Sequence, residues 1–304
     1  MKGKIRTGVL VGILSISLVT PLQAHAYQEP TDYVHMKTSN MIVYSAYGAK
    51  INASEKGDTF SIKATIVNNR QPLEIEIFKN GKDGILKQVA KKGVMEPVAY
   101  RDLGDRVIAT IHNSAELKFV NPQPIYFRDT DNSVYSSYIS TLAERGIVQG
   151  RTADYFGVND SLTRAQFSAL LARAFSFQPV QATQFKDINA KKSWYGGYVG
   201  ALHSLGIIKG KSQNLFDPNG KITRQQAILM LGRTLDAVDF VQEKFVSLPY
   251  QDSFNLQEEA LHHTQTLYAI GALNDNMNLL PNQMISRGEF AKMLAVSLEA
   301  AGRL

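Results

Sequence analysis

Three arginines at nearly regular spacing are the residues whose type and position best suit ligand binding. Arg164, Arg224 and Arg287 lie 60 and 63 residues apart, each directly after a Thr or Ser and two residues before a Gln or Glu. That pattern is a capping box, which starts a helix. A guanidinium at the first helical position, beside free backbone amides, suits a carboxylate or phosphate. We therefore predict outward-pointing arginines at three anion sites; a surface ion pair is the alternative for any one copy.

The capping boxes each open a segment with helical periodicity. Apolar residues recur at spacings of three and four after two of the boxes, at Phe167, Leu170, Leu171 and Ala174, and at Ile228, Leu231 and Leu235. This pattern predicts amphipathic helices with a core face. A period of about 60 residues indicates one supersecondary unit that occurs three times.

The first 26 residues have the features of a secretory signal peptide. Basic residues at the start precede an uncharged run from Thr7 to Leu22 and a small-x-small site at Ala24-His25-Ala26. The run contains Gly, Ser and Pro and is shorter than a membrane-spanning helix needs. We therefore expect a secreted protein with no membrane attachment after signal removal.

Charge and cysteine content narrow the classes of function. The net charge of +6 falls to +3 without the predicted signal, which contains three basic and no acidic residues. A nearly neutral chain gives no argument for a nucleic-acid partner. The sequence has no cysteine, which excludes both disulfides and a cysteine-linked lipid anchor.

Residues 27–124 show the alternation of apolar and polar residues that is typical of β-strands. The pattern is regular around Phe60 to Ile66 and Leu73 to Ile77, and further strands are predicted at Ile85 to Val89, Arg106 to His112 and Glu116 to Val120. Turn signals separate them, so we predict an all-β, immunoglobulin-like sandwich. His35 and His112 are isolated, and no acid pair or nucleophile with a base accompanies them. This module is expected to bind or display something, with another surface protein as the candidate partner.

After a linker at Asn121-Pro122-Gln123-Pro124, the period becomes helical. Three units follow, at residues 125–178, 183–240 and 248–301. Each begins with an aromatic residue two positions before an aspartate: Asp129, Asp187 and Asp252. A first helix ends at a glycine in each unit, where Gly provides the left-handed C-cap. Eight residues before the arginines stand the apolar residues Phe156, Phe216 and Leu279, which we call the plugs.

These units resemble S-layer homology repeats, the wall-anchoring modules of Gram-positive and related bacterial surface proteins. The second unit matches that family's pattern most closely, with Asp187, Trp194, Gly206-Ile207-Ile208-Lys209-Gly210, Phe216-Asp217-Pro218 and Thr223-Arg224. The resemblance covers about 175 residues at the C-terminal end and leaves out residues 27–124. It implies a mainly α, pseudo-threefold prism of three repeats, following the β-domain, with ligand grooves between repeats.

The resemblance also implies a ligand, a secondary cell-wall polysaccharide that often ends in a pyruvylated amino sugar. Its carboxylate would meet the three arginines. The three aspartates would orient sugar or arginine, and Trp194 would pack against the ligand. Four glycines would let the backbone approach the ligand closely: Gly146, Gly150, Gly206 and Gly210.

Several positions depart from the family pattern. The Trp194 position holds Val134 in the first unit and Glu259 in the third, and Asp275 stands where the second unit has Gly210. The family's capping Glu is Gln166 and Gln226 here. We therefore expect two binding grooves, centred on Arg164 and Arg224, with the third unit least complete because it ends the array.

The sequence favours a non-catalytic cell-surface protein that the repeats anchor non-covalently to the wall, with the β-domain displayed. A wall-targeted polysaccharide or peptidoglycan hydrolase is the alternative, and protein binding by the repeats is a third interpretation. We predict no cofactor and no metal. The segment from Asp129 to Ser133 begins like a calcium loop, but Val134 and Ser140 replace the required Gly and Glu. His262 and His263 are adjacent and diverge on a helix.

Overall fold

The structure is a computed structural model that describes residues 34–45, 50–65, 73–82, 84–90, 93–111, 113–122, 124–180, 183–189, 192–242 and 246–304. The predicted signal peptide and His112 lie outside the described residues, as does Gln123 of the linker.

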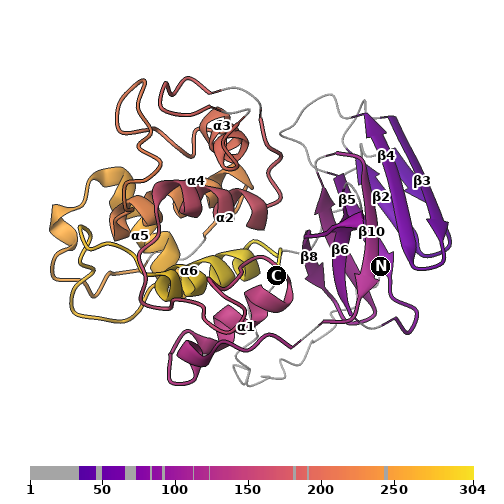
Figure 1. Cartoon of the computed structure of the whole chain (residues 1–304), viewed down its shortest axis with the longest axis horizontal. Helices are drawn as coiled ribbons and strands as arrows, with labels where there is room; N and C mark the ends of the chain where they lie inside the picture. Colours follow the sequence, from indigo (N-terminus) through magenta and orange to yellow (C-terminus); the bar gives the residue numbers. More distant parts are fainter. Residues whose placement is uncertain are drawn as a thin grey trace, which may run out of the picture. The chain divides into compact units, whose positions relative to one another are not determined.

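The strands of the described chain form two antiparallel five-stranded sheets (Figure 1). One sheet has the order β1 (Val34–Lys37), β2 (Met41–Ser45), β5 (Leu73–Phe78), β9 (Arg106–Ile111), β8 (Ala99–Asp102). The other has the order β3 (Lys50–Lys56), β4 (Thr59–Thr65), β10 (Ala115–Val120), β6 (Ile85–Val89), β7 (Met95–Pro97). The predicted sandwich is therefore confirmed as two sheets around one core.

The central strand β5 shows why this sequence forms a sandwich. Its Leu73, Ile75 and Ile77 are at most 1% exposed, while the glutamates between them face the other side of the sheet. Ile75 pairs with Val43 on β2 and with Ala109 on β9. Full burial of one such side chain contributes about 1.5–3 kcal/mol. The alternation therefore fixes which face of the strand enters the core.

Six α-helices follow in the described residues, two in each unit. The first helices are α1 (Ser136–Glu144), α3 (Gly196–Ser204) and α5 (Glu258–Ala269), and the second helices are α2 (Arg164–Ala174), α4 (Arg224–Ala237) and α6 (Arg287–Ala300). Each first helix contacts the second helix of the preceding unit: α3 packs on α2 and α5 on α4 (Figure 1). The first unit's α1 packs on α6 of the third unit, so the contacts return to their start.

The predicted helix starts and stops are confirmed. Thr163, Thr223 and Ser286 each accept the N–H three residues on and donate their own N–H to that residue's side chain. The first helices end at glycines with a left-handed backbone: φ is 75° at Gly146 and 76° at Gly206, and Gly271 is similar. Local residue chemistry thus sets the bounds of the helices that carry the arginines.

A shared centre joins the three units. Leu162, Ile222 and Ile285, each directly before a capping residue, are fully buried. The Ile222 N–H donates to the Leu162 carbonyl at 3.3 Å, and the Ile285 N–H to the Ile222 carbonyl at 3.1 Å. Nearby, the rings of Phe167 and Phe290 lie 4.2 Å apart between centroids. One hydrophobic core therefore runs through all three units.

Candidate functional site

The three arginines connect each unit to the next. Arg164 Nε donates to the carbonyl oxygen of Phe216 at 2.8 Å, and Arg287 Nε to that of Phe156 at 2.9 Å. Arg224 donates through Nη1 to the carbonyl of Leu279. The acceptors are the three plugs. The arginine of the first unit therefore binds in the second unit, that of the second unit binds in the third, and that of the third unit binds in the first.

The first amides of the second helices are also occupied by the neighbouring unit. Arg164 N–H donates to the Gly220 carbonyl at 2.9 Å, and Ala165 N–H to the Pro218 carbonyl at 3.0 Å. Equivalent pairs link Arg224 to Gln283, Gln225 to Pro281, Arg287 to Asp160 and Gly288 to Val158. The expectation of free amides at an anion site is therefore wrong: carbonyls already satisfy them.

The outward orientation predicted for the arginines is wrong as well. Arg164 is 6% exposed, and its guanidinium carbon lies 4.7 Å from the ring centroid of Phe216. Arg287 stacks in the same way on Phe156, at 4.5 Å. Burial lowers the pKa of both arginines. At Arg164 and Arg287 a plug ring and a plug carbonyl take the place of water beside the guanidinium.

The guanidinium groups differ in what remains available for a ligand. Both terminal nitrogens of Arg164 have no hydrogen-bond partner among the described residues. Arg287 uses one, which donates to the Gln149 carbonyl at 2.8 Å. Arg224 has one terminal nitrogen paired with Glu289 and the other on the Leu279 carbonyl. Arg164 therefore uses one of its five N–H donors, while Arg287 and Arg224 use two each, and of the three only Arg224 is paired with a carboxylate.

The three aspartates hold the plugs in place. Asp129 Oδ1 accepts from Phe156 N–H at 2.7 Å, and its Oδ2 accepts from the next two amides at 2.8 and 2.9 Å. Asp187 binds the amides of residues 216 and 217, and Asp252 those of residues 279 and 280. Burial acts to raise the pKa of Asp129, but the three amide bonds outweigh it and lower the pKa below its usual 3.8. Each carboxylate thus positions the carbonyl that an arginine uses.

The glycines divide into two kinds. Gly146 and Gly206 provide the left-handed turn after a first helix. Gly150 and Gly210 lie against the aromatic residue that precedes each aspartate: an added Cβ would come within 2.4 Å of the Phe127 ring and 2.5 Å of the Phe185 ring. The backbone at Gly150 and Gly210 therefore has to approach another group closely, and in the structure that group is an aromatic ring of the same unit.

Trp194 and Glu259 have different surroundings despite their matching sequence positions. Trp194 is 65% exposed and meets Tyr195 edge-on, at 5.4 Å between centroids. Glu259 lies inside α5 and pairs with Arg233 at 2.7 Å and Lys209 at 3.1 Å. The hydrogen bond from Arg233 lowers the pKa of Glu259 to about 2. The third unit instead exposes Phe254, a residue that sequence reasoning missed.

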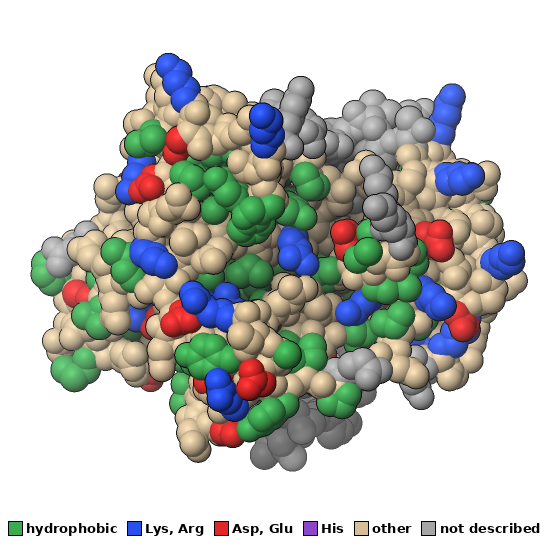
Figure 2. All heavy atoms as spheres, in the orientation of Figure 1, with side chains coloured by type: hydrophobic (Ala, Val, Ile, Leu, Met, Phe, Trp, Pro, Cys, Tyr) green, Lys and Arg blue, Asp and Glu red, His purple; other side chains and the backbone are tan. Residues whose placement is uncertain are grey.

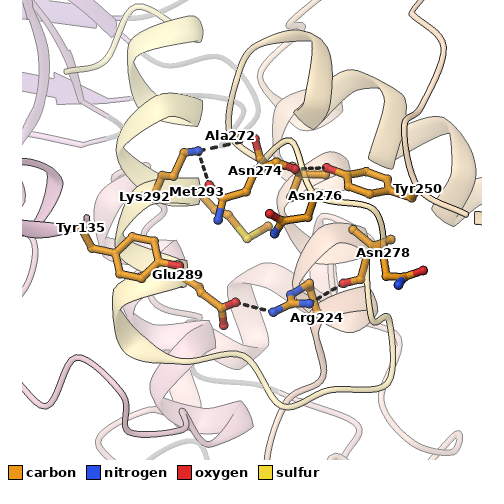
Figure 3. A pocket seen from close by; sticks show the side chains of 12 residues that line it. Tyr135, Arg224, Tyr250, Ala272, Asn274, Asn276, Asn278, Glu289, Lys292 and Met293 are labelled. Carbon is orange, nitrogen blue, oxygen red and sulfur yellow. Dashed lines mark hydrogen bonds and ion pairs between the residues drawn. The ribbon is translucent and has the colours of Figure 1, made fainter. Parts of the chain in front are cut away.

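A hollow open to solvent lies where the third unit meets the first and the second, and it includes Arg224, on which the sequence centred one of the two expected grooves (Figure 3). Its walls are the loop after Gly271 and the start of α6, with Tyr135 from the first unit and Arg224 from the second. Its loop side carries asparagines at 274, 276 and 278, which the sequence interpretation did not single out.

Charges of both signs are interspersed over the face that Figure 2 shows. Within the described ranges no group of three His, Asp or Glu side chains could hold a metal ion. No helix there is both long and apolar enough to cross a membrane.

Two segments of the chain match the family model of the S-layer homology domain, at residues 126–168 and 184–228. They contain the aspartates and arginines of the first two units, Asp129, Arg164, Asp187 and Arg224. The S-layer homology domain is therefore found in two segments of this chain, each with one of the aspartates and one of the arginines.

Several curated relatives are similar to this chain over the region of the helical units. An endoglucanase from Bacillus sp. (strain KSM-635) is 30% identical over 181 residues, which are 57% of this chain and 18% of the relative. The surface-layer 125 kDa protein of Lysinibacillus sphaericus is 26% identical over 53% of this chain and 14% of its own length. S-layer protein EA1 of Bacillus anthracis is 26% identical over 54% of this chain and 19% of its own length. The chain thus spans less than a fifth of these relatives, and the similarity indicates a cell-surface, wall-associated protein.

Proposed function

We propose that this chain is a secreted, non-catalytic surface protein of a Gram-positive bacterium, held to the cell wall by a secondary polysaccharide. The observation that carries the proposal is the pair of segments matching the S-layer homology domain, with an arginine of incomplete hydrogen bonding in the first. In this proposal the third unit is a third repeat, and the three form a pseudo-threefold prism. The immunoglobulin-like sandwich is displayed and meets a surface-protein partner.

The proposed ligand carries a carboxylate, such as a pyruvyl ketal on an amino sugar. The terminal nitrogens of Arg164, and the remaining donor capacity of Arg287, would receive it, because a planar fork of N–H groups suits a carboxylate. Arg224 contributes less to anion binding here than the sequence suggested, since Glu289 occupies it. Trp194 offers an exposed ring for a sugar face. The aspartates and glycines shape the loops around the groove.

Co-sedimentation of the full chain with purified sacculi tests this proposal. Binding should be lost when the secondary polysaccharide is stripped from the sacculi. Trp194→Ala should weaken binding roughly 5- to 30-fold, which corresponds to about one or two kcal/mol. Val241→Ala is the matched control, because Val241 is 64% exposed. Equal binding to stripped sacculi would refute the polysaccharide as ligand.

The enzyme alternative has a separate readout. The glycosidase-named relatives align over the anchor region, so they give no support for catalysis in this chain. Release of reducing sugar from purified walls by the chain would replace the proposal with that of a wall-targeted hydrolase.

A further inference from the structure

The outer face of the sheet that contains β3, β4 and β10 is basic. It carries four lysines, which we call the lysine face: Lys50, Lys56, Lys63 and Lys118. Their neighbours along the strands, such as Ile62 and Leu117, enter the core of the sandwich. Because side chains alternate between the two faces of a strand, the lysines lie on the side away from that core. Three of them are exposed, and Lys118 is half-buried.

The strand register brings lysines of different strands close together. Thr59 of β4 pairs with Lys56 on one side and with Lys118 on the other, so these two lysines stand in one row, about 10 Å apart. Lys63 lies farther along β4, about 14 Å from that row. Lys118 is also directly opposite Lys87 of β6, and like charges in such a pair destabilise a sheet. The separations are comparable with the Debye length of about 10 Å at 0.1 M salt, so a single anionic chain can interact with several of these charges.

Acidic side chains leave the lysine face largely uncompensated. Glu116 of β10 shares the face, but it is opposite Ser61 rather than a lysine. Asp58, in the turn after Lys56, is already paired with Lys82 at 3.0 Å. In the part of the chain that the structure describes, the lysines with ion pairs are other ones: Lys79, Lys82, Lys209 and Lys211. The charge of the lysine face is therefore available to a ligand.

Protection of a sheet edge explains only part of this pattern. Lysines on an edge strand discourage pairing with another chain, which accounts for Lys50 and Lys56 on β3. Lys63 and Lys118 lie on the second and third strands, which have a paired strand on both sides. Edge protection gives no reason for a lysine at either of these positions.

The other sheet of the sandwich compensates its charges within the chain. Glu76, on the central strand β5, accepts a hydrogen bond from the Tyr44 hydroxyl at 2.8 Å. The same carboxylate pairs with Arg106 of β9 at 3.0 Å. The uncompensated charge of the lysine face is thus not a general property of this sandwich, and it indicates a partner from outside the chain.

The residues of the lysine face suit phosphate groups. An ammonium binds phosphate as a point charge, without the planar geometry that a guanidinium offers to a carboxylate. Thr59 and Ser61 lie between the lysines and can donate hydrogen bonds to phosphate oxygens. The described strands of this sheet have no aromatic residue on their outer face, so bases would find no ring on which to stack. A row of charges on a sheet, rather than a hollow, fits a linear polymer with repeated phosphates.

We propose that the lysine face binds a linear polyol phosphate of the bacterial cell surface, a polymer of phosphodiesters without bases. The inference goes beyond the proposed function, because anchoring there depends on the helical units and on a carboxylate. The similarity to cell-surface, wall-associated proteins places a wall polymer within reach of the sandwich. The sandwich thereby makes a second contact with the surface, and salt weakens this contact steeply.

Fluorescence anisotropy with labelled poly(glycerol phosphate) and the full chain tests this proposal over a range of salt concentrations. Contacts with four phosphates of a flexible chain predict a slope of about −3 for log K against log salt. Lys63→Gln and Lys118→Gln should each weaken binding about fivefold at low salt and reduce the slope by nearly one. Lys37→Gln is the matched control, because Lys37 is an exposed lysine on β1 of the other sheet. Unchanged binding in both variants, or an equal loss in the control, would overturn the proposal.

A variant that strengthens binding excludes damage to the fold as the explanation. Glu116→Gln removes the acid from the lysine face and keeps the size of the side chain. It should raise affinity for poly(glycerol phosphate) about threefold at low salt, because one repulsive charge is lost. An affinity that stays the same or falls in this variant would contradict binding at this face.

Two other polymers test the class of ligand. Oligothymidylate has phosphodiesters and bases, and it should bind no more tightly than poly(glycerol phosphate), because the face offers no ring for stacking. Hyaluronate has one carboxylate in every second sugar and should bind at least about tenfold more weakly, because fewer charges meet the lysines. Oligothymidylate binding more than about tenfold more tightly would make this a nucleic-acid site, and equal binding of hyaluronate would make carboxylates the ligand. Either result overturns the proposal.

Sedimentation with sacculi keeps this inference apart from the proposed function. Sacculi that retain the secondary polysaccharide but lack polyol phosphate should still bind the chain with Lys63→Gln and Lys118→Gln combined. If the chain sediments but does not bind poly(glycerol phosphate), the lysine face fails as a site while the anchoring function stands. If it binds poly(glycerol phosphate) but does not sediment with these sacculi, the anchoring function fails and the lysine face stands.

Discussion

Replacing Asp129 by asparagine should destabilise the helical units although the two side chains have the same shape. The aspartate accepts three backbone amides, one on Oδ1 and two on Oδ2. In its better orientation, an asparagine keeps the two hydrogen bonds that Oδ2 accepts and turns its NH₂ group toward the Phe156 N–H. One amide left without an acceptor costs about 1–3 kcal/mol. The matched control is Asp154→Asn, whose carboxylate is 62% exposed, with an expected change within about 0.5 kcal/mol.

Urea unfolding followed by helical circular dichroism measures this difference at several pH values. The pKa of Asp129 is lower in the folded than in the unfolded chain, so its contribution is present above about pH 3.8. It is lost as pH falls through the folded-state pKa. The gap between wild type and Asp129→Asn should therefore be full at neutral pH and shrink in acid. A gap equal to that of Asp154→Asn, or one independent of pH, would refute the role of Asp129 as the support of its plug.

Two further predictions concern buried contacts. Burial lowers the pKa of His263, and Asp236, 3.8 Å away, opposes that effect only partly, so stability should fall as pH drops below about 6.5 through the lower folded-state pKa. His263→Leu should remove this pH dependence in urea titrations, whereas persistence of the slope would show another group to be responsible. Gly210→Ala should cost more than Gly206→Ala, by about 1–3 kcal/mol in thermal unfolding. Both positions have positive φ, but only at Gly210 would the Cβ meet an aromatic ring, so equal losses would contradict the packing argument.

Local features were predictable because their causes lie within a few residues. Each capping box spans four positions, and β5 alternates without interruption. The edge strand β3 (Lys50–Lys56) was missed because its half-buried face carries only one large apolar residue, Ile51, beside Ala53 and Glu55. The arginine partners were not predictable, since Arg164, Arg224 and Arg287 bind carbonyls 52, 55 and 131 residues away. The constant spacing of eight residues between plug and arginine was the one sequence signal that pointed to this pairing.

Closure of the contacts changes how the third unit is understood. The sequence suggested a terminal repeat whose departures reflect the end of an array, although the resemblance also implied a pseudo-threefold prism of three repeats. In the structure α6 packs on α1, and Arg287 binds the first unit's plug, so the third unit has a neighbour on both sides. Gly288, next to that arginine, would place a Cβ 2.6 Å from the Tyr135 ring. Its lack of a side chain is therefore what the closing contact requires. The same Tyr135 also lines the hollow that includes Arg224, so one residue of the first unit contributes both to the closing contact and to that hollow.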